Sequence, residues 1–135
     1  MNYTGTFIAV AEDCKVDYGK VPASRGSSKT VAEIQYEMLL KHPFAYTQED
    51  VLFESWFARQ DLEVSDQEKA ELRKQFFAKE QPCLRTSPLT RTHGWGMVFD
   101  KEGRVALCAM DSPEYSGYLE SSDLKVLKAM RSKRA

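Results

Sequence analysis

The sequence predicts an α+β domain, in which a small antiparallel sheet has a helical layer packed on one face. Three observations support this class. Helical periodicity fills most of residues 30–80, two strand-like runs separated by a tight turn follow in residues 94–110, and a short β-branched and aromatic run comes before both. Because strands and helices are grouped and do not alternate, the pattern favours α+β over α/β.

The chain length fits one domain, residues 1–135. Hydrophobic residues make up 42% and charged residues 29%, as in ordinary globular proteins. The net charge of −1 provides no overall field that would attract nucleic acid. The start of the chain has no positive region, and its apolar run is too short for a signal peptide or a membrane span. We therefore expect a cytoplasmic protein without a membrane partner.

The first elements are predicted from Thr6 to the proline at position 43. The run Thr6–Val10 favours a strand. Thr30 and Glu33 form the pattern of a capping box, which predicts that a helix begins there. Its apolar spacing stops at His42, before Pro43.

Two more helices are expected before residue 82. Thr47 begins the second, with acidic residues in its first turn. Ser65 and Glu68 form another capping box, and Phe76 belongs to the apolar face of the helix that follows.

The second half predicts a hairpin and two helices. Gly94–Phe99 and Arg104–Met110 favour strands joined by a tight turn. A hydroxyl, a proline and an acid at residues 112–114 predict a short helix. Leu124, Leu127 and Met130 then lie at helical spacing, so a basic C-terminal helix is expected.

The stretch "CLRTSPLTRTHGWGM" is the candidate site, because it gathers two arginines, several hydroxyls, a histidine and a glycine-flanked tryptophan. Guanidinium groups and hydroxyls suit the recognition of phosphate or carboxylate. We therefore expect a non-catalytic binding domain for an anionic small molecule or protein partner. The predicted binding residues are Arg85, Thr86, Ser87, Arg91, His93 and Trp95, with Arg25 and Lys29 as helpers from the first loop. The alternative is that the arginines form salt bridges with acidic segments.

Two other functions stay open at this stage. A small hydrolase or transferase would use His93 as acid–base group and Cys83 as nucleophile, although a solvated histidine and a buried, inert thiol are commoner. Weak nucleic-acid binding would use the basic C-terminal helix, and is the less favoured of the two.

Metals and cofactors are not expected. The two histidines lie far apart, the three cysteines show no CxxC spacing, and phosphate-binding and nucleophile-elbow motifs are absent from the sequence.

Opposite charges are segregated along the C-terminal part. Residues 105–123 hold four acids and no base, and residues 124–135 hold five bases and no acid. Such blocks can pair between copies of the chain, so a homo-oligomer is a further expectation.

Several motifs together resemble a family of small bacterial proteins catalogued only as a domain of unknown function. They are "YTQEDVLF", "CLRTSPL", "HGWGM", "SPEY" and "KAMRSKR", in that order, and the resemblance extends to "TFIAVAEDC" and "KTVAEIQYEML". It spans nearly the whole chain. The resemblance implies a stand-alone bacterial cytoplasmic domain and brings no activity, ligand or catalytic residue.

Overall fold

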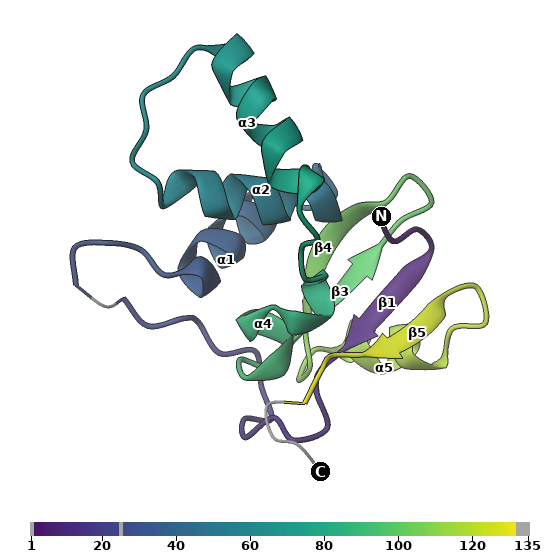
Figure 1. Ribbon diagram of the computed structural model, residues 1–135. Coiled ribbons are helices and arrows are strands. Elements are labelled where there is room, and N and C mark those ends of the chain that lie inside the picture. The colour runs from purple at the N-terminus through teal and green to yellow at the C-terminus, as the bar shows by residue number, and fades with distance from the viewer. Residues whose placement is uncertain (1, 25, 132–135) are drawn as a thin grey trace.

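Among the described residues, five short strands form one sheet in the order β2-β4-β3-β1-β5. The structure, a computed structural model, describes residues 2–24 and 26–131 (Figure 1). Neighbouring strands are antiparallel except β1 and β5, which are parallel. The predicted α+β class is therefore confirmed, with a mixed and mostly antiparallel sheet. The strands are β1 Thr6–Ala9, β2 Tyr46–Thr47, β3 Trp95–Phe99, β4 Arg104–Ala109 and β5 Lys125–Lys128.

Alternation along the strands gives the sheet two apolar faces. Ile8, Met97 and Val105 point to one face and belong to the larger core. Phe7 and Val98, their neighbours in sequence, point to the other face and belong to a second cluster. Both faces must therefore be covered by other elements.

The larger face is covered by α1 (Val31–Lys41), α2 (Gln48–Ala58), the 3₁₀ turn η1 (Leu84–Thr86) and α4 (Pro88–Arg91). Each of the two long helices begins at the threonine that the sequence indicates. Thr30 and Thr47 both form complete capping boxes, in which the hydroxyl accepts a backbone N–H and the third helical residue accepts the threonine N–H. These helix starts are confirmed.

The opposite face is covered by α5 (Pro113–Glu120). Tyr115 and Tyr118 contact Phe7, with ring centroids 5.4 and 5.3 Å apart. The Tyr115 hydroxyl accepts a hydrogen bond from the Val10 N–H at 2.9 Å. Burial is the main cause that raises the pKa of Tyr115. The short helix predicted at residues 112–114 is thus confirmed, and it gives the sheet a second, smaller core.

Helix α3 (Asp66–Ala78) packs on α2 and lies away from the sheet (Figure 1). Its Phe76 ring lies 5.7 Å from that of Phe53 and 5.1 Å from that of Trp56. Two ion pairs, Lys69–Glu54 and Arg73–Asp50, also join the two helices. No residue of α3 is buried in this part of the structure. None of its residues belongs to the core cluster on the sheet, so α3 packs on α2 and lies outside that core.

The predicted C-terminal helix is wrong, because residues 125–128 form strand β5. The Lys125 N–H donates to the Gly5 carbonyl at 3.0 Å, and the Ala129 N–H donates to the Ala9 carbonyl at 2.9 Å. These carbonyl groups lie along the edge of β1. Pairing with that edge outweighs the helical spacing of Leu124, Leu127 and Met130. The nucleic-acid hypothesis therefore loses the helix on which it depended.

Across the described ranges, no helix has the length and apolar character needed to cross a membrane.

Candidate functional site

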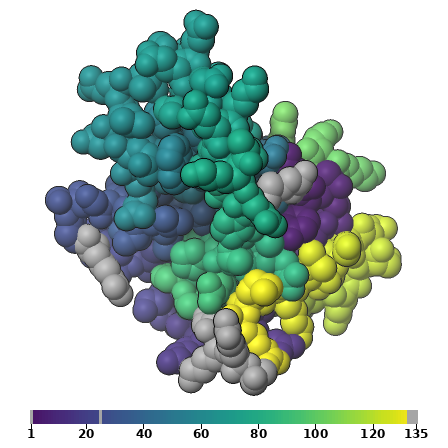
Figure 2. All heavy atoms as spheres, viewed as in Figure 1, coloured from purple at the N-terminus to yellow at the C-terminus, as the bar shows by residue number. Residues whose placement is uncertain are grey.

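The segment from Cys83 to His93 folds by using its own hydroxyls. Thr86 donates to the Cys83 carbonyl at 2.7 Å, Thr90 donates to the Ser87 carbonyl at 3.1 Å, and Ser87 accepts from the Leu89 N–H at 3.2 Å. Ser87 begins α4, with Pro88 at its first position, where a proline fits a helix. On the face shown in Figure 2, this green segment lies between the teal helices and the yellow C-terminal strand. Many of the segment's polar groups therefore form hydrogen bonds within the segment and stabilise its own turn.

Arg85 points toward the C-terminal strand. Its Nε–H donates to the Lys128 carbonyl at 2.7 Å, and its own carbonyl accepts from the Met130 N–H at 2.8 Å. Arg85 lines none of three cavities of the described structure, whose volumes are about 720, 450 and 230 Å³. The fold therefore does not place Arg85 and Arg91, the predicted pair, in the same cavity.

Arg91 lines a groove of about 720 Å³. The groove lies between the loop of residues 13–23, the start of α1, and α4 with the two residues after it. The Arg91 side chain is half-buried, and its Nε–H has no hydrogen-bond partner among the described residues. Its Nη2 lies 3.5 Å from the Arg131 carbonyl, and none of the ion pairs within the described residues involves it.

The groove carries an excess of positive charge. Lys15 and Lys20 line it together with Arg91, and Asp13 contributes a carboxylate. Sequence reasoning missed both lysines, because they lie some 70 residues before Arg91 in the chain. The sequence does place both lysines in a loop soon after the first strand. It does not show which surface of the protein that loop faces.

His93 also lines this groove, and its ring orientation is fixed on one side. Its Nδ1 lies 3.1 Å from the Pro88 carbonyl oxygen and 2.8 Å from the Thr92 hydroxyl. Because a carbonyl can only accept, this geometry suits a proton on Nδ1, which leaves Nε2 as the acceptor. No carboxylate of the described chain bonds to the ring in this arrangement.

Cys83 does not lie with His93. It lines a different cavity, and it forms a hydrogen bond with Tyr3. Burial, followed by this contact, raises the pKa of Tyr3 to about 12. The two groups of the predicted cysteine–histidine chemistry are therefore not assembled in one cavity.

Trp95 holds the wall of the groove. Its Nε1–H donates to the Lys20 carbonyl at 2.8 Å, and the Lys20 N–H donates to the His93 carbonyl at the same distance. The indole packs against Tyr36, with centroids 5.5 Å apart, and against Gly19. Trp95 thus fixes the loop that carries Lys20, and its own side chain lines none of the three cavities of the described residues.

Of the two predicted helper residues, the structure describes Lys29 alone. Lys29 is exposed and forms an ion pair with Glu37 at 2.6 Å, outside the groove. Arg25 lies outside the described residues.

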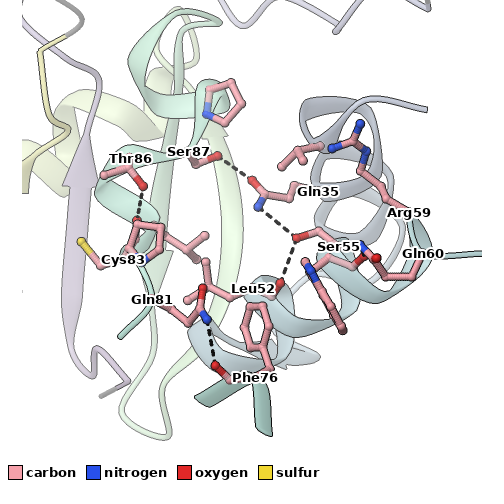
Figure 3. Close-up of a pocket in the computed structure, with 15 residues that line it drawn as sticks. Gln35, Leu52, Ser55, Arg59, Gln60, Phe76, Gln81, Cys83, Thr86 and Ser87 are labelled. Atoms are coloured by element: carbon pink, nitrogen blue, oxygen red, sulfur yellow. Dashed lines mark hydrogen bonds between the residues drawn. The ribbon is translucent and has the colours of Figure 1, made fainter. Parts of the chain in front are cut away.

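A second cavity of about 230 Å³ lies where α1, α2 and the end of α3 meet residues 81–88 (Figure 3). Thr86 and Ser87 line one side, as the sequence segment suggests, and Arg59 and Gln60 lie on the opposite side. A chain of hydrogen bonds runs from Ser87 through Gln35 to Ser55 of α2. Ser87 donates to Gln35 Oε1 at 2.6 Å, Gln35 Nε2 donates to Ser55 at 3.3 Å, and Ser55 donates to the Val51 carbonyl at 2.7 Å.

Sequence reasoning missed Gln35, Ser55 and Arg59. A usable signal existed for the first two, because each is a polar residue at a core-facing position of a helix. Gln35 lies between Val31 and Leu39 at i, i+4 spacing, and Ser55 follows Val51 at the same spacing.

The described residues contain no group of three or more histidine, cysteine, aspartate or glutamate side chains that could hold a metal ion.

Comparison with known proteins gives a family but no characterised relative. A family model described as a family of unknown function matches residues 1–135. No curated protein and no solved structure matches the chain.

Proposed function

Since the chain belongs to this family of unknown function, DUF6157, its role has to be argued from its own surface, and we propose that it is a non-catalytic binding domain. The groove at Arg91 holds the anionic group, a phosphate or carboxylate, of a small molecule. Arg91 binds the anion directly, and Lys15 and Lys20, which also line the groove, attract it.

The state of the Arg91 side chain is the observation that carries this proposal. Its Nε–H is buried without a partner among the described residues, although a buried N–H normally forms a hydrogen bond. A guanidinium offers donors in a fixed planar fork, which matches the oxygens of phosphate and carboxylate. A bound anion would satisfy this donor.

The size and lining of the groove also support a small molecule. Its volume of about 720 Å³ lies within the range of small-molecule sites, roughly 300–1,000 Å³. The Thr92 hydroxyl and His93 Nε2 lie along the same wall and can orient polar groups of the ligand.

Isothermal titration with inorganic phosphate, nucleoside phosphates and small carboxylates tests the proposal. We expect binding that weakens as ionic strength rises, because exposed lysines contribute to it. Arg91→Gln is expected to reduce affinity about tenfold or more, since charge-assisted hydrogen bonds are lost.

Lys29→Gln is the matched control, because it removes one positive charge from a residue outside the groove. It is expected to leave the affinity unchanged. The proposal is overturned if the wild-type chain binds none of these anions, or if Arg91→Gln binds them as tightly as the wild type does.

A further inference from the structure

The cavity of Figure 3 is separate from the groove at Arg91, although Val31 and Pro88 line both. Its walls are largely apolar. Leu52 and Trp56 come from α2, and Phe76 comes from α3, which covers this side of the cavity. The Trp56 and Phe76 rings lie 5.1 Å apart at an interplanar angle of 41°. Tilted rings of this kind offer both faces and edges to a further aromatic ring.

Gln35 is a buried polar residue of the cavity, and its side-chain nitrogen has more N–H donors than hydrogen-bond partners among the described residues. Gln35 is 3% exposed, and its Oε1 accepts from Ser87. A carboxamide nitrogen carries two hydrogens, and Gln35 Nε2 donates to Ser55 alone among the described residues. The second N–H is therefore available to an acceptor inside the cavity.

Arg59 supplies a positive charge at the rim. It lies at the C-terminal end of α2, it is exposed, and it lines the cavity opposite Thr86 and Ser87 (Figure 3). Among the ion pairs and side-chain hydrogen bonds of the described residues, none involves its guanidinium group. Its position suits an anionic group at the mouth of an otherwise apolar cavity.

The volume limits the size of an occupant. An apolar cavity of about 150 Å³ can hold benzene. The cavity measures about 230 Å³, which leaves room for one ring and a small substituent. We propose that it binds a single-ring aromatic carboxylate, with the ring against Trp56 and Phe76 and the carboxylate at Arg59.

A nuclear magnetic resonance titration with benzoate, and with benzyl alcohol as its neutral counterpart, tests this site. The chain has two tryptophans, Trp56 and Trp95, and each gives one indole N–H signal. Benzoate is expected to shift the Trp56 signal and to leave that of Trp95, which lines neither cavity, unchanged. Arg59→Gln is expected to weaken benzoate about tenfold and to leave benzyl alcohol unaffected, because only the acid loses its charge partner.

Lys41→Gln is the matched control, because it removes one exposed positive charge from the end of α1, outside the cavity. It should not change the affinity for benzoate. Absence of binding at millimolar benzoate overturns the proposal, as does equal affinity of Arg59→Gln and the wild type. Benzoate shifts confined to His93 and its neighbours would overturn it too, and would instead assign the acid to the groove. Failure here leaves the Arg91 proposal intact, since the two variants act on different cavities.

Discussion

At the scale of single residues, Gly94 allows the loop before α1 to approach the sheet. Its φ is +75°, and a Cβ atom at this position would lie 2.0 Å from the Tyr18 carbonyl oxygen. Gly94 and Gly96 flank Trp95 in the sequence. The structure shows that the space beside Gly94 is filled by the chain's own backbone.

Replacing Gly94 by alanine is therefore expected to destabilise the fold by about 2–4 kcal/mol, from left-handed backbone strain and overpacking together. Chemical denaturation measures this change. Gly117→Ala is the control, because it lies in α5 with no atom within 4 Å of the new Cβ, and it is expected to stabilise by about 0.5–1 kcal/mol. Equal stability of the two variants would contradict this account.

The protonation of Glu12 depends on contacts that the fold makes with the C-terminal segment. Hydrogen bonds from Lys128 and then Arg131 lower its pKa from 4.5 to about 2. The unfolded carboxyl binds a proton as the pH falls below about 4.5, and the folded one does not. The stabilisation is thus present above pH 4.5 and is lost as the pH falls toward 2.

A carbon-detected titration of the Glu12 carboxyl measures this pKa directly. Lys128→Ala is expected to raise it toward the ordinary value, because the largest cause of the shift is removed. Lys125→Ala removes a charge from the same strand without touching Glu12 and should leave it low. A wild-type pKa near 4.5 would show that the contact does not form.

At the scale of elements, α3 depends on local signals more than the other long helices do. None of its residues is buried, so its capping box carries an unusual share of its stability. Ser65→Ala removes the hydroxyl that accepts from the Glu68 N–H, at a cost of about 1 kcal/mol. We expect amide exchange in α3 to become about fivefold faster. Ser27→Ala, in an exposed loop, should leave the amide exchange rates of α3 unchanged. If α3 exchanges at the same rate in the Ser65→Ala and Ser27→Ala variants, the Ser65 cap is not its main local source of stability.

Elements defined by local chemistry could be predicted from the sequence, and elements defined by distant partners could not. Thr30, Thr47 and Ser65 fix three helix starts through contacts three residues away. Strand β5 depends on β1, more than a hundred residues earlier, and its own residues also fit a helix. The two-residue strand β2 is likewise set by its pairing with β4.

At the scale of the whole molecule, the predicted site divides into three parts. Arg85 turns to the C-terminal strand, Thr86 and Ser87 line the cavity of Figure 3, and Arg91 and His93 line the groove. Adjacent residues in a tight turn point in different directions, so closeness in sequence could not predict convergence. The lysines that complete the groove come from a separate loop, which only the fold brings near.

The segregated charges are partly used within the chain, because Lys128 and Arg131 of the basic block both bind Glu12. Self-association between the acidic and basic blocks stays a prediction. Sedimentation at low and at high salt tests it, since a contact of this kind weakens with ionic strength.

The pairing of β1 with β5 has a consequence for synthesis on the ribosome. The first strand emerges early, yet its parallel neighbour at residues 125–128 is made more than a hundred residues later. Until then one edge of β1 stays open to chaperones or to other nascent chains. Completion of the sheet must therefore wait for translation to pass residue 128, however early the helices form.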